Sequence, residues 1–542
     1  MEDIESLRKK FFIDYNQNNY EELIRLLKIG LDSVFNNSGE GPTYPQFNKI
    51  SLNQMINDTN VPMKVIEPEE TLKEIYKYFG GCQKAGHARM YKNVLPEANM
   101  VGLIITLLGN LYMPNGVTGE DAGNVLNSEL ECSSAISQMA GYDPNVSAGI
   151  FTFGGTGTNL YAIKLGLLKC NQDHSKNGNI NNVVVIGSHA AHYCHEVACN
   201  WLGIGEENFI KAKSNQDQTT DLKDLEEKFE GALKEGKKIA AIILSGGTTS
   251  NMGIDNVKEV YDFREKMIKK YRLDYIPHIH FDSVIGWAYL SFKYYDLDTN
   301  KFNFSKETCS QIRKILKNIE TIKYADSFGV DFHKTGYVNY IASMIVIKNR
   351  KDLDALKKRK EKTTPLFHDD LAYNPGIYTL ETSRSAANIL ASWLSFKSLG
   401  IEGYQLLLGN AMEVGNYFRK LFNNSIRNGL YVINSDYYGP DIFLGCTKEN
   451  GKYEKLINDE KNVKENNKYT SEFAKWLIKN RAEGNDGYTV SKSSAAIYNK
   501  SGKSIIGIRI YPLSPYITIS DMKILYERII KDKDEFDRKS KQ

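Results

Sequence analysis

The pair His333-Lys334 places a reactive amine directly after a predicted strand. It follows an apolar run at residues 328–330 and precedes a glycine turn at Gly336. This arrangement presents one amine at a junction between a strand and a loop. Such an amine can form a Schiff base with an aldehyde if burial or a cationic neighbour lowers its pKa. Because most lysines are solvated surface charges, the prediction depends on what precedes this pair.

From residue 149 onwards, apolar runs alternate with helical segments. The strand-like runs lie at residues 150–153, 183–186, 239–244 and 278–281. Buried strands alternating with helices predict a largely parallel sheet with right-handed crossovers. Ligands collect at the carboxyl ends of the strands in such a sheet. We therefore examine what each predicted strand leads into.

Each predicted strand leads into groups that can bind or react. The first opens into the glycine-rich turn at residues 154–159, whose free N–H groups at a helix start suit a phosphate. This turn is neither G-x-G-x-x-G nor a P-loop, so by itself it fits anion binding or a simple tight turn. The remaining strand ends carry His192, the pair Thr248-Thr249, Asp282 and Lys334. We expect all of them at one edge of the sheet.

Together these groups meet the requirements for holding pyridoxal 5'-phosphate. We expect Lys334 to bind the cofactor covalently and Asp282 to keep its pyridine nitrogen protonated. Gly155 and Thr156 would hold the phosphate, and His192 would lie flat against the ring. The alternatives are a turn or capping acid for Asp282 and a core histidine for His192.

Five motifs resemble, in order and spacing, those of group II pyridoxal-phosphate amino-acid decarboxylases, which include glutamate, tyrosine and aromatic L-amino-acid decarboxylases. They are Gly-Gly-Thr-Gly-Thr-Asn-Leu-Tyr-Ala (154–162), Ala-His-Tyr-Cys with Leu-Gly-Ile-Gly (191–205), Gly-Gly-Thr-Thr (246–249), His-Phe-Asp (280–282) and Ala-Asp-Ser with Asp-Phe-His-Lys (325–334). The resemblance runs from about residue 86 to the C-terminus. It implies an α/β protein of pyridoxal-phosphate fold type I, aspartate aminotransferase-like, and an obligate homodimer with active sites at the subunit interface. It also implies loss of CO2 from an L-amino acid.

The resemblance also assigns individual residues. Thr249 and His333 take cofactor roles by position. Tyr373 lies in a stretch, residues 367–376, that resembles a mobile loop whose tyrosine protonates the carbanion after CO2 leaves; a packed loop tyrosine is the alternative. His87 and Arg509 are the predicted substrate contacts, with a plain loop histidine and a structural ion-pair arginine as alternatives. Where the family has two small residues after the aspartate, this chain has Ser283 and Val284, which could crowd the ring.

Composition narrows the class of protein. A chain of 542 residues with 41% hydrophobic and 25% charged residues predicts two or three domains. A net charge of +3 is too small to imply a nucleic-acid partner, and the longest apolar run, residues 101–113, is too short to span a membrane. Seven cysteines without a C-x-x-C pair argue against a disulfide framework and a metal site. We expect a cytoplasmic protein.

We predict three parts: a helical N-terminal segment (1–85), a large pyridoxal-phosphate domain (86–385) and a smaller α+β C-terminal domain (386–542). The charged stretch at residues 448–468 is predicted to be a solvated loop. Thr335-Gly336-Tyr337, Asn339 and residues 111–115 resemble the tyrosine-decarboxylase branch and favour an aromatic substrate such as tyrosine. The alternatives are glutamate or another L-amino acid, and an aldehyde-forming or carbon–carbon lyase reaction on the same fold. A binding scaffold without chemistry is disfavoured by the pairing of Lys334 with Asp282.

Overall fold

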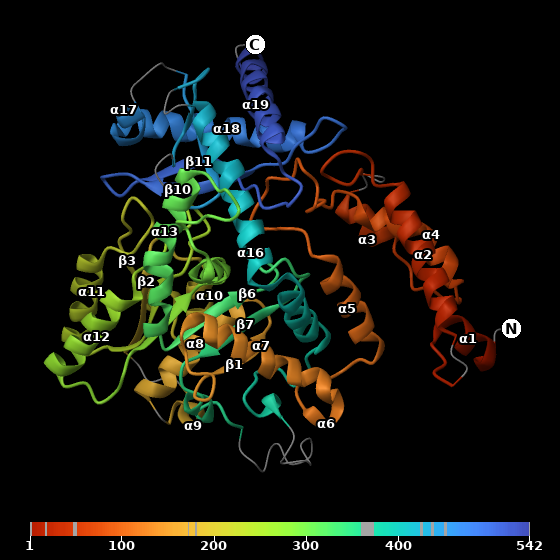
Figure 1. The fold of residues 1–542 in the computed structure, drawn as a ribbon, viewed down its shortest axis with the longest axis horizontal. Helices are drawn as coiled ribbons and strands as arrows, with labels where there is room; N and C mark the ends of the chain where they lie inside the picture. Colours follow the sequence, from red (N-terminus) through yellow and green to blue (C-terminus); the bar gives the residue numbers. More distant parts are fainter. Residues whose placement is uncertain are drawn as a thin grey trace.

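The protein consists of two bodies, each built around a sheet, and a helical arm. The computed structural model describes residues 3–16, 19–46, 51–171, 173–178, 182–358, 373–422, 426–434, 438–448 and 453–540. In Figure 1 the larger body lies below, the smaller one above it, and the N-terminal helices stand to one side.

The larger sheet has seven strands in the order β1-β7-β6-β5-β4-β2-β3. Their bounds are β1 Ala148–Thr152, β2 Val183–Ser188, β3 Phe209–Ala212, β4 Lys238–Ser245, β5 His278–Asp282, β6 Ser327–Asp331 and β7 Ser343–Ile347. β7 runs antiparallel to β1 and β6, and the neighbours from β6 to β3 pair in parallel. The carboxyl ends of β1, β2, β4, β5 and β6 therefore meet at one edge, as the sequence predicts.

Helices that precede β1 or connect the strands pack around this sheet. They are α7 Asn124–Ala140, α8 Gly155–Cys170, α10 Cys194–Trp201, α11 Leu222–Lys234, α12 Val257–Tyr271 and α13 Lys306–Ile319, with the short α6 Gly119–Ala122, α9 His174–Asn177 and α14 Lys351–Asp354. α8 begins directly after β1 because Gly154 has a φ of 103°, a conformation that side chains other than hydrogen disfavour. This turn brings the N-terminus of α8 to the edge where the strand ends meet.

The smaller body contains an antiparallel sheet in the order β10-β11-β9-β8. Its strands are β8 Leu430–Val432, β9 Ile442–Cys446, β10 Ser491–Tyr498 and β11 Ser504–Ile510, and its C-terminal helix is α19 Ile519–Lys539. The long helix α16, Ala387–Phe422, enters this body from the larger one. It is broken at Gly400, where φ is 59° and ψ is 179°, so it consists of two helical halves.

The prediction of a solvated loop at residues 448–468 is wrong. Within it, residues from Tyr453 onwards form α17 Tyr453–Asn458 and the first part of α18 Glu460–Arg481. Asp459 caps α18 by accepting a hydrogen bond from the Asn462 N–H. Val463, Phe473 and Leu477 are buried on one face of this helix. The many lysines and glutamates form the solvated face of an amphipathic helix, which composition alone does not separate from a loop.

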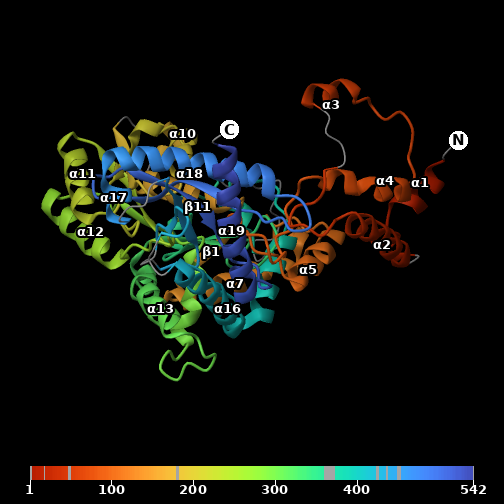
Figure 2. The same cartoon turned by 90° about the horizontal axis from the view of Figure 1, so that it is seen from above.

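The arm comprises α1 Ile4–Phe11, α2 Tyr20–Asn36, α3 Leu52–Asp58 and α4 Pro68–Glu74. Figure 2 shows these helices projecting from one side of the molecule, with α5 Met100–Leu111 the nearest labelled helix of the main body. Among the helices in the described part of the chain, none is both long enough and apolar enough to cross a membrane. The arm is helical, as expected of the N-terminal segment; the exact domain limits remain a prediction.

Candidate active site

A cavity of about 490 Å³ opens where the strand ends of the large sheet meet. The structure brings all seven residues predicted to bind the cofactor to its wall. They are Gly155, Thr156, His192, Thr249, Asp282, His333 and Lys334. Other lining residues are Asn159, Tyr193, Cys194, Val284, Asp331, Tyr340 and Ile341. The cavity is within the size range of cofactor sites in proteins, and the individual roles of these residues remain predictions.

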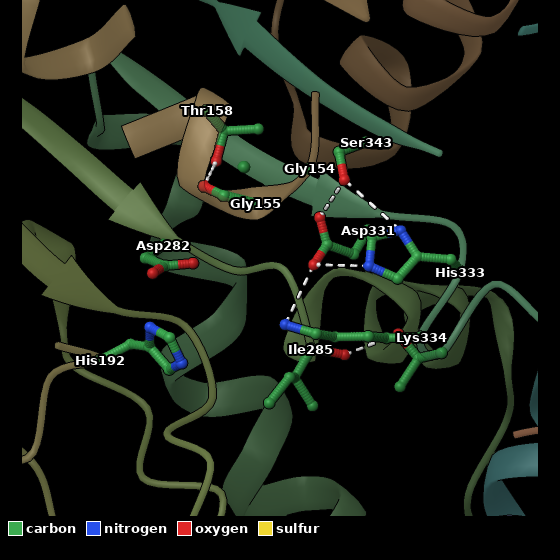
Figure 3. Close-up of polar contacts among 12 residues, drawn as sticks. Gly154, Gly155, Thr158, His192, Asp282, Ile285, Asp331, His333, Lys334 and Ser343 are labelled. Carbon is green, nitrogen blue, oxygen red and sulfur yellow. Dashed lines mark hydrogen bonds and ion pairs between the residues drawn. The ribbon is translucent and has the colours of Figure 1, made fainter. Parts of the chain in front are cut away.

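Lys334 is the only lysine among the described residues that line the cavity, and it is paired with a carboxylate. Its Nζ lies 3.0 Å from Asp331 Oδ2, and Asp331 also accepts a hydrogen bond of 2.5 Å from Ser343 Oγ. In Figure 3 the amine points toward the side of the site that holds Asp282 and His192. Burial lowers the pKa of Lys334, but the charges of Asp331 and Asp282 outweigh it and leave the pKa above its ordinary value.

Reaction with an aldehyde requires a lowered pKa at the lysine amine. Burial acts in that direction here, but the pKa of Lys334 is raised overall. The reason is Asp331, which stands three residues before the lysine at the end of β6 and is 1% exposed. Lys334 must therefore give up a proton before it can react with an aldehyde, and Asp331 is the nearest acceptor.

Asp282 ends β5 and is held on one side only. Its Oδ2 accepts a hydrogen bond of 3.0 Å from Asn159 Nδ2 and lies 3.1 Å from His195 Nε2. Its Oδ1 is buried and has no partner among the described residues. Burial would raise the pKa of Asp282, but the hydrogen bond and charge of His195 and the charges of His280 and Lys334 lower it below its ordinary value. Asp282 therefore presents an ionised oxygen that lacks a donor.

The N-terminus of α8 forms an anion cradle opposite this carboxylate. Gly155 is its first residue, and a Cβ added there would lie 3.0 Å from Asp331 Oδ2 and 3.2 Å from Val284 Cγ1. No larger residue fits without displacing both neighbours. The first N–H groups of a helix lack intrahelical partners and, with the helix dipole, favour an anion such as a phosphate.

His192 and Val284 also line this cavity. His192 accepts a hydrogen bond of 3.2 Å from the Cys194 N–H through Nδ1, and burial lowers the pKa of its ring, which favours the neutral form. Val284 is 7% exposed. The resemblance leads us to expect a small residue at this position. Crowding of the cofactor's ring by the branched side chain of Val284 therefore stays a prediction.

The three residues predicted to meet the substrate or its proton do not line the cavity. His87 Nε2 lies 3.0 Å from the Glu40 carbonyl oxygen, close to the base of the arm. Arg509 donates to Ser491 Oγ at 3.0 Å and Asn93 Oδ1 at 2.7 Å. It reaches the cavity wall only through the Thr249 carbonyl oxygen, at 3.4 Å.

Tyr373 belongs to a buried network beside the cavity. Its hydroxyl donates to Glu129 Oε2 at 2.9 Å, and Glu129 is also paired with Arg384 NH2 at 2.6 Å. Burial, and then the charge of Glu129, raise the pKa of Tyr373 well above its ordinary value. The first residues of the loop predicted to carry this tyrosine, 367–372, lie outside the described residues. Its role as proton donor therefore stays a prediction.

Sequence reasoning missed several residues of the site. Asn159, Cys194 and His195 lie inside the quoted motifs, and Asp331 lies in the stretch that leads to Lys334. Cys194, His195 and Asp282 bring a thiol, an imidazole and a carboxylate within 4.8 Å of one another. Burial raises the pKa of the Cys194 thiol, and Asp282 already uses one oxygen for His195.

The donor set fits pyridoxal phosphate. The unpartnered Asp282 Oδ1 suits a protonated pyridine nitrogen, the start of α8 suits the phosphate, and the Lys334 amine suits the aldehyde. A mainly parallel sheet with these groups at its carboxyl edge defines a protein of pyridoxal-phosphate fold type I.

Comparison with known proteins agrees with this class. Residues 54–436 match the model of the pyridoxal-dependent decarboxylase conserved domain, so the chain belongs to that family. The crystal structure of mouse CSAD has the same fold, with a TM-score of 0.76 and 17% identity over 95% of this chain and 98% of that one.

Two curated relatives differ in substrate. The chain is 28% identical over 289 residues to an aspartate 1-decarboxylase of Aliivibrio fischeri, covering 51% of this chain and 47% of that protein. It is 24% identical over 250 residues to an L-tyrosine decarboxylase of Enterococcus faecalis, covering 43% of this chain and 39% of that protein. The chain thus spans about half or less of the length of these relatives. The family and the cofactor follow from the comparisons, and the substrate does not.

Proposed function

We propose that the protein removes CO2 from an L-amino acid and releases the corresponding amine. The observation that carries this proposal is the cavity in which Lys334, the unpartnered oxygen of Asp282 and the anion cradle at Gly155 face one space. When bound there, pyridoxal phosphate supplies an electron sink for the bond that breaks at the α-carbon. Family membership supports the same reaction class.

The residues of this chain would divide the work as follows. Lys334, once it has lost its proton, would bind the cofactor covalently, and Asp282 would hold the ring nitrogen protonated. His192, kept neutral by burial, would pack on the ring, and exclusion of water from the filled cavity would favour loss of a neutral CO2 molecule. Tyr373 would return a proton to the α-carbon, which requires its hydroxyl to leave Glu129.

An aromatic substrate such as tyrosine is our proposal for the side chain. Tyr193, Tyr340 and Ile341 line the cavity and are 70%, 57% and 50% exposed, so they offer apolar and aromatic surface at its mouth. Among the described lining residues the only lysine or arginine is Lys334, which is already paired with Asp331. An acidic side chain would need a further cation there. An aspartate or glutamate decarboxylase is therefore the weaker alternative.

We also propose a homodimer in the cytoplasm. On α2, Ile24, Leu27, Leu31 and Phe35 are exposed at helical spacing, and on α5 Leu103, Ile104 and Leu108 are at least half exposed. α5 adjoins the cavity mouth, because Thr106 Oγ1 donates to Asn339 Oδ1 at 3.1 Å, one residue before Tyr340. A partner seated on α5 would thus border the active site. All seven cysteines are described and none forms a disulfide, which supports a reducing compartment.

One observation favours an aldehyde-forming reaction as a second candidate. The hydroxyl of Tyr373 is engaged by Glu129 and Tyr373 does not line the cavity, so this tyrosine is not in place to protonate the α-carbon. The two reactions start with the same loss of CO2 and differ in the final product.

The experiment is to load the purified chain with pyridoxal phosphate and offer a panel of L-amino acids. CO2 release is measured, and the organic product is identified by mass spectrometry. We expect the amine from an aromatic amino acid. Aldehyde with consumption of O2 would replace the amine assignment, and no CO2 from any amino acid would contradict the proposed function.

A further inference from the structure

A row of polar side chains runs beneath the cofactor cavity, along β5. His278, His280 and Asp282 alternate along this strand, so their side chains lie on the same face of the sheet. Both histidines are completely buried, and Asp282 reaches the cavity at the carboxyl end of the strand. The row therefore leads from the cavity to the opposite edge of the sheet.

Ser327 of β6 joins the two histidines, and Lys169 of α8 extends the row to the surface. The Ser327 Oγ lies 2.7 Å from His278 Nε2 and 2.8 Å from His280 Nδ1. Lys169 Nζ lies 3.1 Å from His278 Nδ1. The Lys169 side chain is 23% exposed and pairs with Asp352 at 2.8 Å, so solvent reaches this end.

At the cavity end, His195 touches Asp282 and leaves one ring nitrogen unused. His195 Nε2 lies 3.1 Å from Asp282 Oδ2, while His195 Nδ1 and His280 Nε2 are both buried without a partner among the described residues. Burial, and in smaller part the nearby His195, lower the pKa of His280 to about 3. A single water between the two nitrogens would satisfy both, as buried waters commonly do.

The two ends of the row impose the same direction on every hydrogen bond in it. The Lys169 ammonium can only donate, so His278 Nδ1 accepts and His278 Nε2 carries the proton that it donates to Ser327. Ser327 then donates to His280 Nδ1, and His280 Nε2 carries a proton toward His195. The Asp282 carboxylate can only accept, so His195 Nε2 carries its proton and His195 Nδ1 accepts. No donor faces a donor anywhere along the row.

We propose that this row is a proton relay between Asp282 and the protein surface at Lys169. Its members between the two ends are His278, Ser327, His280, a water that we place between the two unpartnered ring nitrogens, and His195. When each group passes one proton to the next, Lys169 loses one, Asp282 gains one, and every group between gives one and takes one. Lys169 recovers its proton from water, and the reverse sequence returns a proton from Asp282 to solvent.

The relay would matter when the cavity is filled. Asp282 is 8% exposed and its remaining free oxygen faces the cavity, so a bound cofactor closes its direct route to solvent. The relay would keep the proton shared by Asp282 and the cofactor's ring nitrogen in exchange with water. This role rests on the proposed function, because it requires the cofactor to sit on Asp282.

Burial leaves the rings of His278 and His280 neutral, as a relay needs. Burial, then the charges of Lys169, His280 and Arg264, lower the pKa of His278 well below its ordinary value. Arg264, on α12, is itself paired with Asp326 at 2.5 Å. On the cavity side, Asp282 raises the pKa of His280, but burial has the larger effect. Each ring therefore keeps one N–H and one lone pair near neutral pH.

The test follows the proton on the ring nitrogen in the holoenzyme, using 15N-labelled pyridoxal phosphate and NMR. Ser327→Ala removes the hydroxyl between the two imidazoles, and Lys169→Met removes the surface end of the row together with its hydrogen bond to His278 Nδ1. We expect each to slow exchange of this proton with solvent by about 100-fold, the lower end of the range for loss of one positioned proton-transfer group. The double variant should be no slower than the slower single variant, because both interrupt one path.

Matched controls separate the relay from general damage. Ser392→Ala removes another buried hydroxyl, which bonds only within α16, and Lys164→Met removes another lysine of α8. Both should exchange at the wild-type rate. Equal exchange rates in wild type, Ser327→Ala and Lys169→Met would overturn the relay while leaving the proposed function intact. Failure of the wild type to bind the labelled cofactor would overturn the proposed function, and the relay with it.

Discussion

The residues predicted to hold the cofactor line one cavity, whereas the three predicted to meet the substrate or its proton lie outside it. We call the first set, Gly155, Thr156, His192, Thr249, Asp282, His333 and Lys334, the cofactor group. The second, His87, Tyr373 and Arg509, is the substrate group. The cofactor group stands at strand ends and a helix start of one sheet, and the substrate group belongs to connecting segments and the smaller body.

The difference has a physical origin. Strand ends are fixed by the hydrogen bonds of the sheet, so one chain is enough to bring them together. The substrate group is positioned by other parts of the chain. Arg509, for example, belongs to β11 of the smaller sheet, and its side chain reaches the cavity wall through one hydrogen bond of 3.4 Å, to the Thr249 carbonyl. A partner subunit seated on α5, or a movement of the Tyr373 loop, would complete that half of the site. The predictions below test this division.

Lys334→Ala should have the largest effect, because it removes the only lysine on the described cavity wall. The long-wavelength absorption of the bound cofactor should disappear, and CO2 release should fall by about 10⁴-fold. Lys164→Ala, on the outer part of α8, is the control and should retain both signals. An unchanged spectrum in Lys334→Ala would remove this residue from the cofactor group.

Asp282→Asn should have the next largest effect, since it keeps the shape of the side chain and removes its charge. We expect CO2 release to fall by about 10²- to 10³-fold and the cofactor to bind less tightly, measured by titrating apoprotein.

The lowered pKa of Asp282 also predicts that the stability of the folded protein depends on pH. Because its folded pKa lies below the ordinary value of 3.8, its stabilising contribution is present above pH 3.8 and is lost as the pH falls below it.

Acid unfolding of apoprotein measures this contribution. Below pH 3.8 the wild type should lose stability more steeply than Asp282→Asn. Parallel curves for the two proteins would contradict the depressed pKa of Asp282.

The cofactor group and the substrate group also differ in how well the sequence predicted them. Alternating apolar runs located β1, β2, β4 and β5 to within two residues, and the strand-end rule then placed Asp282 and Lys334 at one edge. The short edge strand β3 was missed, because Phe209–Ala212 offers only four residues of pattern. Asp331 was overlooked because a carboxylate before a lysine has no distinctive spacing. Positions set by tertiary contacts, such as that of Tyr373 on Glu129, leave no local pattern to read.

Tyr373→Phe tests the substrate group most directly. If Tyr373 returns the proton to the α-carbon, its loss should divert product from amine toward aldehyde, which mass spectrometry separates. Glu129→Gln weakens the contact that holds the hydroxyl away from the cavity and should move the product ratio in the opposite direction, provided its fold, checked by circular dichroism, is retained. An unchanged product profile in Tyr373→Phe would exclude this tyrosine from the chemistry.

Asp331→Asn should change the pH dependence of the rate at which pyridoxal phosphate attaches to Lys334. Removing this charge leaves burial as the main influence on Lys334, so the pKa of the amine should fall. A larger fraction of neutral amine at a given pH should move the pH profile of cofactor loading to lower pH and make loading faster at neutral pH. The appearance of the absorption band after mixing measures this rate. A profile that stays in place would show that Asp331 does not set the charge of Lys334.

Arg509→Lys should have the smallest effect. If Arg509 contacts the substrate carboxylate in the assembled enzyme, KM should rise by about 3- to 10-fold with kcat little changed. If it acts only through Thr249, the affinity for pyridoxal phosphate should fall and KM should stay the same. Measuring both constants assigns Arg509 to one of the two groups.

The most direct test of the account is to find which residue carries the cofactor. The protein is loaded with pyridoxal phosphate, reduced with borohydride so that the cofactor becomes permanently attached, digested, and mapped by mass spectrometry. We predict a single modified peptide with the label on Lys334, and none in Lys334→Ala. A label on any other lysine, or no label in the loaded wild type, would contradict the claim that the strand ends of this one chain build the cofactor site.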